Sequence, residues 1–137
     1  MKRDSVNPSA WGLQYRMDQG EVVEGATRHL RLSGQVALVE DAGAPMGVSV
    51  IHAGDIRGQI GAALGNVDAV LAKAGMTRAD IVALRFFTTD MDGFLENYDV
   101  YADWIAPAGI NPPQSLLGVA RLVLPDLLVE IEAEAAV

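Results

Sequence analysis

Three glutamates near the end of the sequence, Glu130, Glu132 and Glu134, alternate with apolar residues. A carboxylate that faces a pocket can orient or deprotonate a water molecule, which is hydrolase chemistry. The same alternation also arises whenever a sheet is covered on one face and solvated on the other. The spacing alone therefore predicts a solvated sheet face for all three glutamates.

Other polar side chains lack the partners that catalysis or metal binding requires. Ser33 has no evident general base to activate it as a nucleophile. His29 and His52 have no second ligand at helical or hairpin spacing, so we expect no metal site. The sequence has no cysteine, which excludes disulfides, thiolate zinc sites and cysteine nucleophiles. We expect no cofactor.

The charge balance is acidic. Ten Lys and Arg residues against eighteen Asp and Glu residues give a net charge of −8. Nucleic-acid binding gains most of its affinity from basic residues, so we expect no nucleic-acid partner. No apolar run is long enough to span a membrane, and residues 1–12 lack the apolar segment of a signal peptide. We expect a cytoplasmic protein with no membrane partner.

The length favours a single domain over residues 1–137, in which residues 1–12 form a loose lead-in. Residues 29–38 alternate as a strand, and Gly34 within them marks a bulge or a close backbone approach. Residues 40–54 are rich in glycine and predict a loop.

The best-defined element is a helix that follows Asp55 as its N-cap and ends at Gly75. Gly58, Gly61 and Gly65 lie inside this helix, at a cost of about 1 kcal/mol each relative to alanine. Two explanations stay open. The glycines allow close packing against a sheet or a neighbouring subunit, or they lie on a tolerant helix surface.

The second half of the sequence alternates between strand and helix patterns. Residues 81–89 predict a strand, and a second amphipathic helix follows Asp90. Residues 114–124 and 127–136 are predicted to pair as a hairpin. Two helices cover only one face of such a sheet, yet residues 114–124 are apolar on both faces. We therefore expect another copy of the chain to cover the second face.

Several segments resemble the RidA/YjgF family. The strongest is Asn111–Leu122 followed by Leu128–Ala133, which is similar to the family's C-terminal signature. Ser33–Gln35, Leu71–Gly75 and Thr88–Asp92 resemble its Ser-Gly-Gln strand end, its helix terminus and its Thr-Asp-hydrophobic-Asp junction. The resemblance covers roughly residues 13–136. It implies an α+β, chorismate-mutase-like fold with a mixed sheet of about six strands, two helices on one face, and a homotrimer with ligand clefts between subunits.

The best-known members of this family hydrolyse reactive enamine or imine acids to keto acids and ammonia. The resemblance places the family's water-positioning acid at Glu130 and its pocket serine and glycine at Ser33 and Gly34. It places the carboxylate-binding arginine at Gln114, the small or cysteine residue at Leu116, the pocket asparagine at Tyr98 and the pocket tyrosine at Tyr15.

Glutamine at position 114 changes the expected chemistry. Arginine offers a charged planar fork that binds a carboxylate through two hydrogen bonds, whereas glutamine offers one neutral hydrogen bond. Arg121 lies an odd number of residues further along the predicted strand and so faces the other way. Arg31 and Arg85 lie on other strands and remain candidates for compensation. A neutral or cationic small molecule is favoured over a carboxylate-bearing imine.

Three functions follow as hypotheses. The first, which we favour, is binding of a small metabolite in the clefts between subunits, with little or no catalysis. The second is an enamine or imine deaminase in which Glu130 positions water. The third is a ribonuclease, a label that some relatives carry, and the net charge of −8 and the absence of a catalytic His/Lys pair disfavour it.

Overall fold

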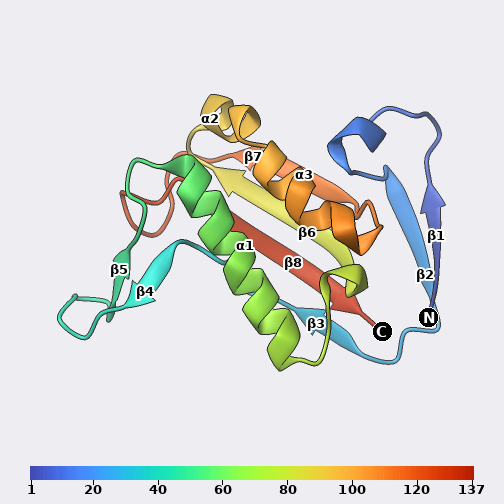
Figure 1. Cartoon of the computed structure of the whole chain (residues 1–137), viewed down its shortest axis with the longest axis horizontal. Coiled ribbons are helices and arrows are strands. Elements are labelled where there is room, and N and C mark those ends of the chain that lie inside the picture. Colours follow the sequence, from blue (N-terminus) through green and yellow to red (C-terminus); the bar gives the residue numbers. More distant parts are fainter.

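The computed structural model describes residues 1–137 and is built around a mixed four-stranded sheet (Figure 1). Its strands, in spatial order, are β3 (His29–Arg31), β8 (Val129–Ala136), β6 (Ile81–Thr88) and β7 (Gln114–Gly118). β6 pairs antiparallel with β8 and parallel with β7. The α+β class and the mixed sheet match the expectation, but the central sheet has four strands rather than about six.

The N-terminal arm, residues 1–24, carries a separate two-stranded sheet. In it β1 (Lys2–Val6) pairs antiparallel with β2 (Gly20–Glu24), and the short 3-10 helix η1 (Leu13–Tyr15) lies between them. The expectation of a loose lead-in over residues 1–12 is therefore wrong for its first half. No periodicity marks this strand, because most of its side chains are exposed.

The strand predicted over residues 29–38 is interrupted after β3. Gln35 makes only an isolated bridge to β8, and the chain then enters β4 (Leu38–Glu40). β4 pairs with β5 (Val48–Val50), so part of the predicted loop over residues 40–54 is a β-hairpin. This hairpin projects from the body at the left of Figure 1.

Helix α1 (Ile56–Lys73) lies across one face of the central sheet (Figure 1). As predicted, the Asp55 carboxylate accepts a hydrogen bond from the Gly58 backbone N–H at 3.0 Å. Gly75 follows the last turn with a φ of 72°, a left-handed conformation that suits glycine at a helix end.

The second predicted helix is present as two short pieces, α2 (Met91–Glu96) and α3 (Asp99–Ile105), on the same face of the sheet as α1. Asp90 caps α2 by accepting from the Gly93 N–H at 3.0 Å. Asn97 leaves the helical conformation, and its side-chain amide donates to the Gly93 carbonyl at 2.8 Å. The break places the next residue, Tyr98, at the junction of the two pieces.

The hydrophobic core fills the space between these helices and the central sheet. β8 alternates as predicted, with its apolar residues buried under the helices and its glutamates on the other face. The Phe86 ring on β6 lies 4.9 Å from the Tyr101 ring and 5.5 Å from the Phe94 ring, measured between centroids. These three fully buried rings join α2 and α3 to the sheet.

β7 and β8 do not form the predicted hairpin, because β6 lies between them. The chain runs from β6 to β7 through α2 and α3, and a strand–helix–strand connection of this kind gives parallel pairing. β7 also ends at Gly118, earlier than the predicted Leu124, and Val123 beyond it is 61% exposed. The argument that placed Arg121 on the opposite face of this strand therefore does not apply.

Two of the three glycines inside α1, Gly61 and Gly65, lie on its surface in the single chain, whereas a Cβ atom at Gly58 would overlap Asp55 and His52. A Cβ atom at Gly61 or Gly65 would meet no atom within 4 Å, and both residues are exposed. Alanine costs less conformational entropy than glycine in a helix. We expect Gly65→Ala to raise the free energy of unfolding by about 0.5–1 kcal/mol in a urea titration. A loss of stability instead would support the alternative, that another subunit packs closely on this surface.

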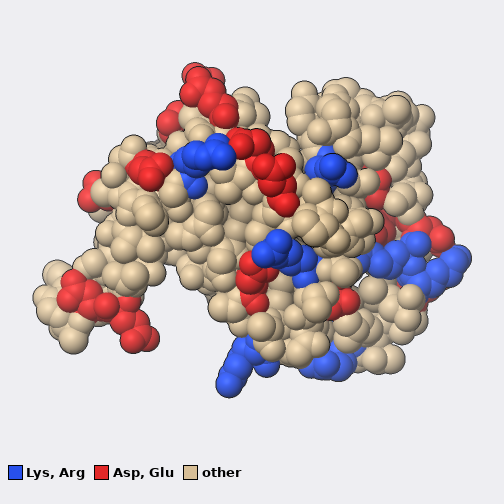
Figure 2. All heavy atoms as spheres, in the orientation of Figure 1, with Lys and Arg blue, Asp and Glu red and all other residues tan.

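In Figure 2, Asp and Glu side chains gather around α2 and α3 and on the β4–β5 hairpin, and several Lys and Arg side chains lie between and below them. None of the helices combines the length and the apolar character needed to cross a bilayer.

Candidate functional site

The seven predicted site residues divide between the two faces of the central sheet. Gln114 pairs in register with Leu84, which is buried under the helices, so Gln114 faces the helix side. Glu130 pairs in register with Phe87, on the opposite face, which no helix covers. We call this second face, which carries Arg85, Phe87, Leu117, Glu130, Glu132 and Glu134, the open face.

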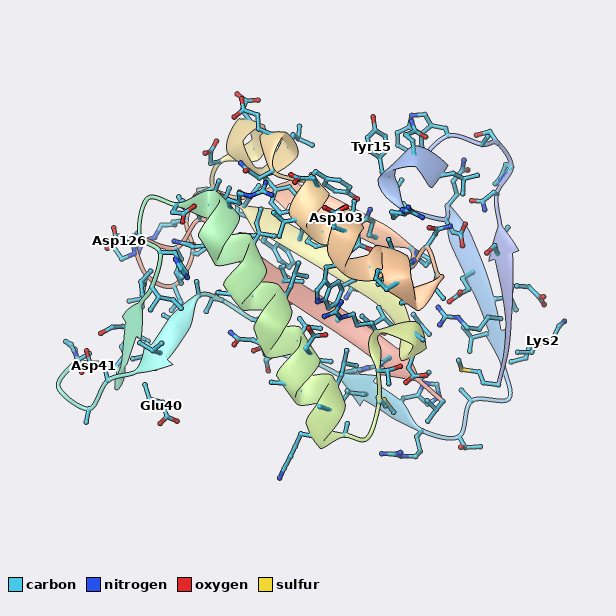
Figure 3. The ribbon with its side chains drawn as sticks, viewed as in Figure 1. Lys2, Tyr15, Glu40, Asp41, Asp103 and Asp126 are labelled. Atoms are coloured by element: carbon cyan, nitrogen blue, oxygen red, sulfur yellow. The ribbon has the colours of Figure 1, made fainter.

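Four of the seven predicted residues come together on the helix side, in a cleft of about 700 Å³ between the N-terminal arm and the α2–α3 junction. Pockets of about 300–1,000 Å³ are typical of small-molecule sites. We call it the Tyr98 cleft; it is lined by Trp11, Tyr15, Met17, Leu95, Tyr98, Gln114 and Leu116. Six of these seven are hydrophobic, and none is charged. Figure 3 labels Tyr15 on the wall that the arm contributes.

A chain of hydrogen bonds closes the cleft on its inner side. The Tyr98 hydroxyl donates to the Tyr15 backbone carbonyl at 2.7 Å. The Gln114 side-chain amide donates to the Tyr98 hydroxyl oxygen and, at 3.4 Å, to the same Tyr15 carbonyl. The Gln114 Oε1 atom is enclosed and has no hydrogen-bond partner. The amide of Gln114 is thus engaged in holding the arm, and we call this set of bonds the latch.

Local backbone conformations bring Tyr15 to the latch. Gly12 (φ 102°) and Arg16 (φ 58°) flank η1, both in left-handed conformations that fold the chain tightly. Beyond the turn, the Asp18 backbone N–H donates to the Asn111 carbonyl at 2.9 Å, which ties the arm to the segment before β7. Sequence patterns give no signal for these contacts. For this reason Trp11 and Met17, which also line the cleft, were not predicted as site residues.

Tyr98 remains a hydroxyl donor at neutral pH. Burial raises the pKa of the Tyr98 phenol; the hydrogen bond from Gln114 acts in the opposite direction. Its ring also packs in an aromatic cluster, 5.6 Å from the Tyr101 ring and 6.0 Å from the Tyr15 ring. Since a raised pKa keeps the phenol protonated, the latch does not open by ionisation near neutral pH.

The other three predicted residues lie together on or beside the open face. A Cβ atom at Gly34 would overlap the Glu130 carboxylate, so the predicted close backbone approach at Gly34 is confirmed, and Ser33 is its chain neighbour. Burial, and then the charge of Glu132, raises the pKa of the Glu130 carboxyl. A carboxylate with a raised pKa is a better general base than one in free solution.

Neither of the two arginines considered for compensation lines the Tyr98 cleft. Arg85 lies on the open face, 3.6 Å from the Glu132 carboxylate and 3.5 Å from that of Glu134. Arg31 lies at the sheet edge, in register with Glu134. Arg85 does line a neighbouring groove of about 650 Å³ beneath the arm, which Gln114 also borders.

The two histidines lie apart from both sets of residues. His29 is the first residue of β3, and His52 precedes α1, where its Nδ1 atom lies 3.9 Å from the Asp55 carboxylate. Neither histidine lines the Tyr98 cleft.

Sequence and structure comparisons point to one family. The sequence model described as Endoribonuclease L-PSP matches residues 19–137. A RutC family protein from Aquifex aeolicus is 37% identical over 70 residues, which cover 51% of this chain and 55% of that protein. The putative reactive intermediate deaminase TdcF from Escherichia coli is 34% identical over 82 residues, 59% of this chain and 63% of TdcF. These matches thus span less than two thirds of the relatives' lengths.

Solved structures extend the similarity over more of the chain. YyfB from Yersinia pestis, a Rid family protein described as of unknown function, aligns over 100% of both chains with a TM-score of 0.81 and 28% identity. A crystal structure of TdcF from E. coli with bound serine covers 88% of this chain and 87% of TdcF, with a TM-score of 0.66 and 30% identity.

Proposed function

This chain belongs to the RidA/YjgF family, and from that premise we propose that it binds a small metabolite in clefts between the copies of a homotrimer. Binding, with little or no turnover, is the main function in this proposal. The Tyr98 cleft forms one wall of the site, and the open face of a neighbouring copy supplies the other.

The proposal rests on the few polar groups of the Tyr98 cleft, which form hydrogen bonds within the protein. The Gln114 amide and the Tyr98 hydroxyl are both engaged in the latch. The remaining lining residues are apolar or aromatic, and none ionises near neutral pH. Such a cleft can enclose and orient a ligand, but within one chain it offers no group that could activate water.

The separation of the predicted residues onto two faces supports a shared site. Glu130 and Gly34 cannot reach the Tyr98 cleft of their own chain, because the sheet lies between them. A second copy placed with its open face against the cleft would bring both sets of residues together. Exposed apolar side chains on the two surfaces, including Trp11, Leu95 and Leu117, fit such a contact.

A second candidate function is that of an enamine or imine deaminase. The raised pKa of Glu130 and its place against Gly34 favour this chemistry. The relative TdcF, by its name a putative reactive intermediate deaminase, points the same way. Under this alternative, Glu130 of one copy would position water against a ligand held in the cleft of its neighbour.

An assay with freshly generated 2-aminoacrylate separates the two candidates. We expect wild type to release ammonia and keto acid little faster than the uncatalysed reaction. Gln114→Arg adds the missing cation, so a gain in rate is expected, and Glu130→Gln should abolish that gain. Robust turnover by wild type that Glu130→Ala abolishes would overturn the ranking in favour of the deaminase.

Light scattering tests the assembly on which both candidates depend. We expect a mass of about three times the 14.5 kDa chain mass in dilute solution. A monomer at micromolar concentration would contradict a site shared between copies.

A further inference from the structure

The strand β3 leaves backbone groups free at one edge of the central sheet. Arg28 and Val137 exchange two backbone hydrogen bonds, at 3.0 and 3.1 Å. In an antiparallel pair only every second residue bonds its partner in this way, so His29 and Arg31 direct their N–H and C=O groups away from β8. β3 is the last strand on this side of the sheet. Free groups on such an edge can pair with a further strand.

An apolar groove of about 520 Å³ lies beside this edge, between β3 and the end of α1. The residues that line it are Leu30, Ala69, Val70, Lys73 and Ala74. Arg28 lies next to the groove and donates to the Ala74 carbonyl at 2.8 Å, and Arg31 is exposed on β3. None of Arg28, Arg31 and Lys73 forms an ion pair. This corner of an acidic chain is therefore basic.

The β4–β5 hairpin carries the opposite charge and also has a free edge. The Asp41 N–H donates to the Gly47 carbonyl at 2.8 Å, so the preceding residue, Glu40, directs its backbone groups away from β5. Figure 3 labels Glu40 and Asp41 on this projecting hairpin. Val39 beside them is 46% exposed. In Figure 2, acidic side chains lie on the hairpin and basic ones lie along the lower edge, below α1 and β3.

We propose that β4 of one copy adds to the sheet of a second copy, beside β3. Neighbouring side chains of a strand point to opposite faces. Val39 would then lie in the apolar groove against Leu30, and Glu40 would lie on the other face beside Arg31, which is in register with Glu134 of the open face. Strand addition supplies backbone hydrogen bonds, and the side chains on its two faces supply specificity. The opposite charges of the two surfaces favour a second copy as the partner.

This contact is separate from the proposed ligand site. β3 and β7 lie at opposite edges of the sheet, and Gln114 of the Tyr98 cleft is on β7. The contact joins two different surfaces, so each pair of copies keeps a free hairpin and a free edge, and the assembly can grow. Because β3 and β4 have three residues each, the contact is small, and we expect a dissociation constant of about 0.1–1 mM.

Sedimentation equilibrium of the intact protein at about 10 µM and at about 1 mM tests the inference. In about 0.1 M salt we expect the weight-average mass to rise at least about twofold between these concentrations. The rise should be smaller in about 1 M salt, which screens the attraction. Non-specific association would show the opposite salt dependence, because chains with a net charge of −8 repel one another.

Glu40→Lys on the hairpin and Lys73→Glu in the groove should each remove most of this rise. An equimolar mixture of the two variants should restore part of it, since the intact hairpin of one then meets the intact groove of the other. Asp103→Lys is the matched control, because it reverses a charge at an exposed position of α3, and it should associate like wild type.

A mass that does not rise with concentration, or a rise that neither variant reduces, overturns the contact. A mixture that associates no more than either variant alone shows that the hairpin and the groove are not partners. The mass at about 10 µM reports separately on the homotrimer, so the two proposals can fail independently. Circular dichroism of each variant establishes that the fold is retained.

Discussion

Phe86→Ala is expected to lower the free energy of unfolding by about 3–5 kcal/mol. Phe86 is fully buried and contacts the rings of Phe94 and Tyr101, so truncation removes apolar contacts from both α2 and α3 at once. Those two helices carry Tyr98 at their junction. We therefore also expect ligand affinity in the Tyr98 cleft to fall, even though Phe86 does not line it.

Urea unfolding followed by circular dichroism measures the stability change. Val123→Ala is the control, since Val123 is also apolar but is 61% exposed. We expect the control to change stability by less than about 0.5 kcal/mol. A loss of under about 1 kcal/mol for Phe86→Ala would contradict the packing of α2 and α3 on β6.

Arg3→Met is expected to release the N-terminal arm from the body and to lower stability by about 2–4 kcal/mol. The Arg3 guanidinium forms two hydrogen bonds with the Glu21 carboxylate, at 2.9 and 3.0 Å. It also donates to the backbone carbonyls of Ala79 and Ile81, each at 2.6 Å. The Glu21 side chain is only 7% exposed, so removal of Arg3 leaves a nearly buried carboxylate unpaired. The expected loss is below that for a fully buried pair, because the Arg3 side chain is 17% exposed.

Lys2→Met provides a neighbouring comparison on the same strand. Lys2 pairs with Asp4 and Glu24, but all three side chains are at least half exposed. Exposed pairs contribute little, so this variant should unfold like wild type. Limited proteolysis should cut the arm of Arg3→Met faster than that of Lys2→Met. Equal protection of the two arms would show that the Arg3 contacts do not hold the arm on the body.

Local signals in the sequence predicted the local structure well. Asp55 and Asp90 cap their helices as expected, and Gly75 ends α1. Gly34 approaches another residue closely, as a glycine inside a strand pattern suggested. In each case the signal depends on neighbours within a few residues, where propensity and capping rules are informative.

Contacts between distant segments were not predictable in the same way. β6 pairs with both β7 and β8 because of the spatial order of the strands in the sheet. Alternation along one strand does not encode that order. Arg3 binds backbone carbonyls 76 and 78 residues away, and a backbone acceptor leaves no trace in the sequence. For this reason the N-terminal arm, with Trp11 and Met17, was missed as a wall of the site.

Four of the predicted residues line one cleft, but the sequence did not predict how the seven are arranged. Tyr15, Tyr98, Gln114 and Leu116 meet in one cleft, whereas Ser33, Gly34 and Glu130 lie on or beside the other face of the sheet. The substitution at position 114 also has a consequence beyond the loss of charge. A glutamine amide fits between a phenol oxygen and a backbone carbonyl, so it joins the latch.

In the function that we propose, binding and turnover make different demands on the site. The Tyr98 cleft is lined by uncharged residues, while the carboxylate of Glu130 lies on the open face. Turnover would need a neighbouring copy to bring Glu130 to within hydrogen-bond distance of a water beside the bound ligand. Binding needs the neighbouring copy only as a wall of the site, whereas turnover also needs Glu130 to reach the ligand, and this difference supports the order in which we rank the two functions.

Hydrogen exchange of the Gln114 side-chain amide, followed by NMR on protein labelled at glutamine, tests the latch most directly. We expect its protons to exchange slowly in wild type and to exchange fast in Tyr98→Phe, which removes one of the two acceptors of the amide. Fast exchange in wild type, as fast as in Tyr98→Phe, would contradict an amide engaged within the protein.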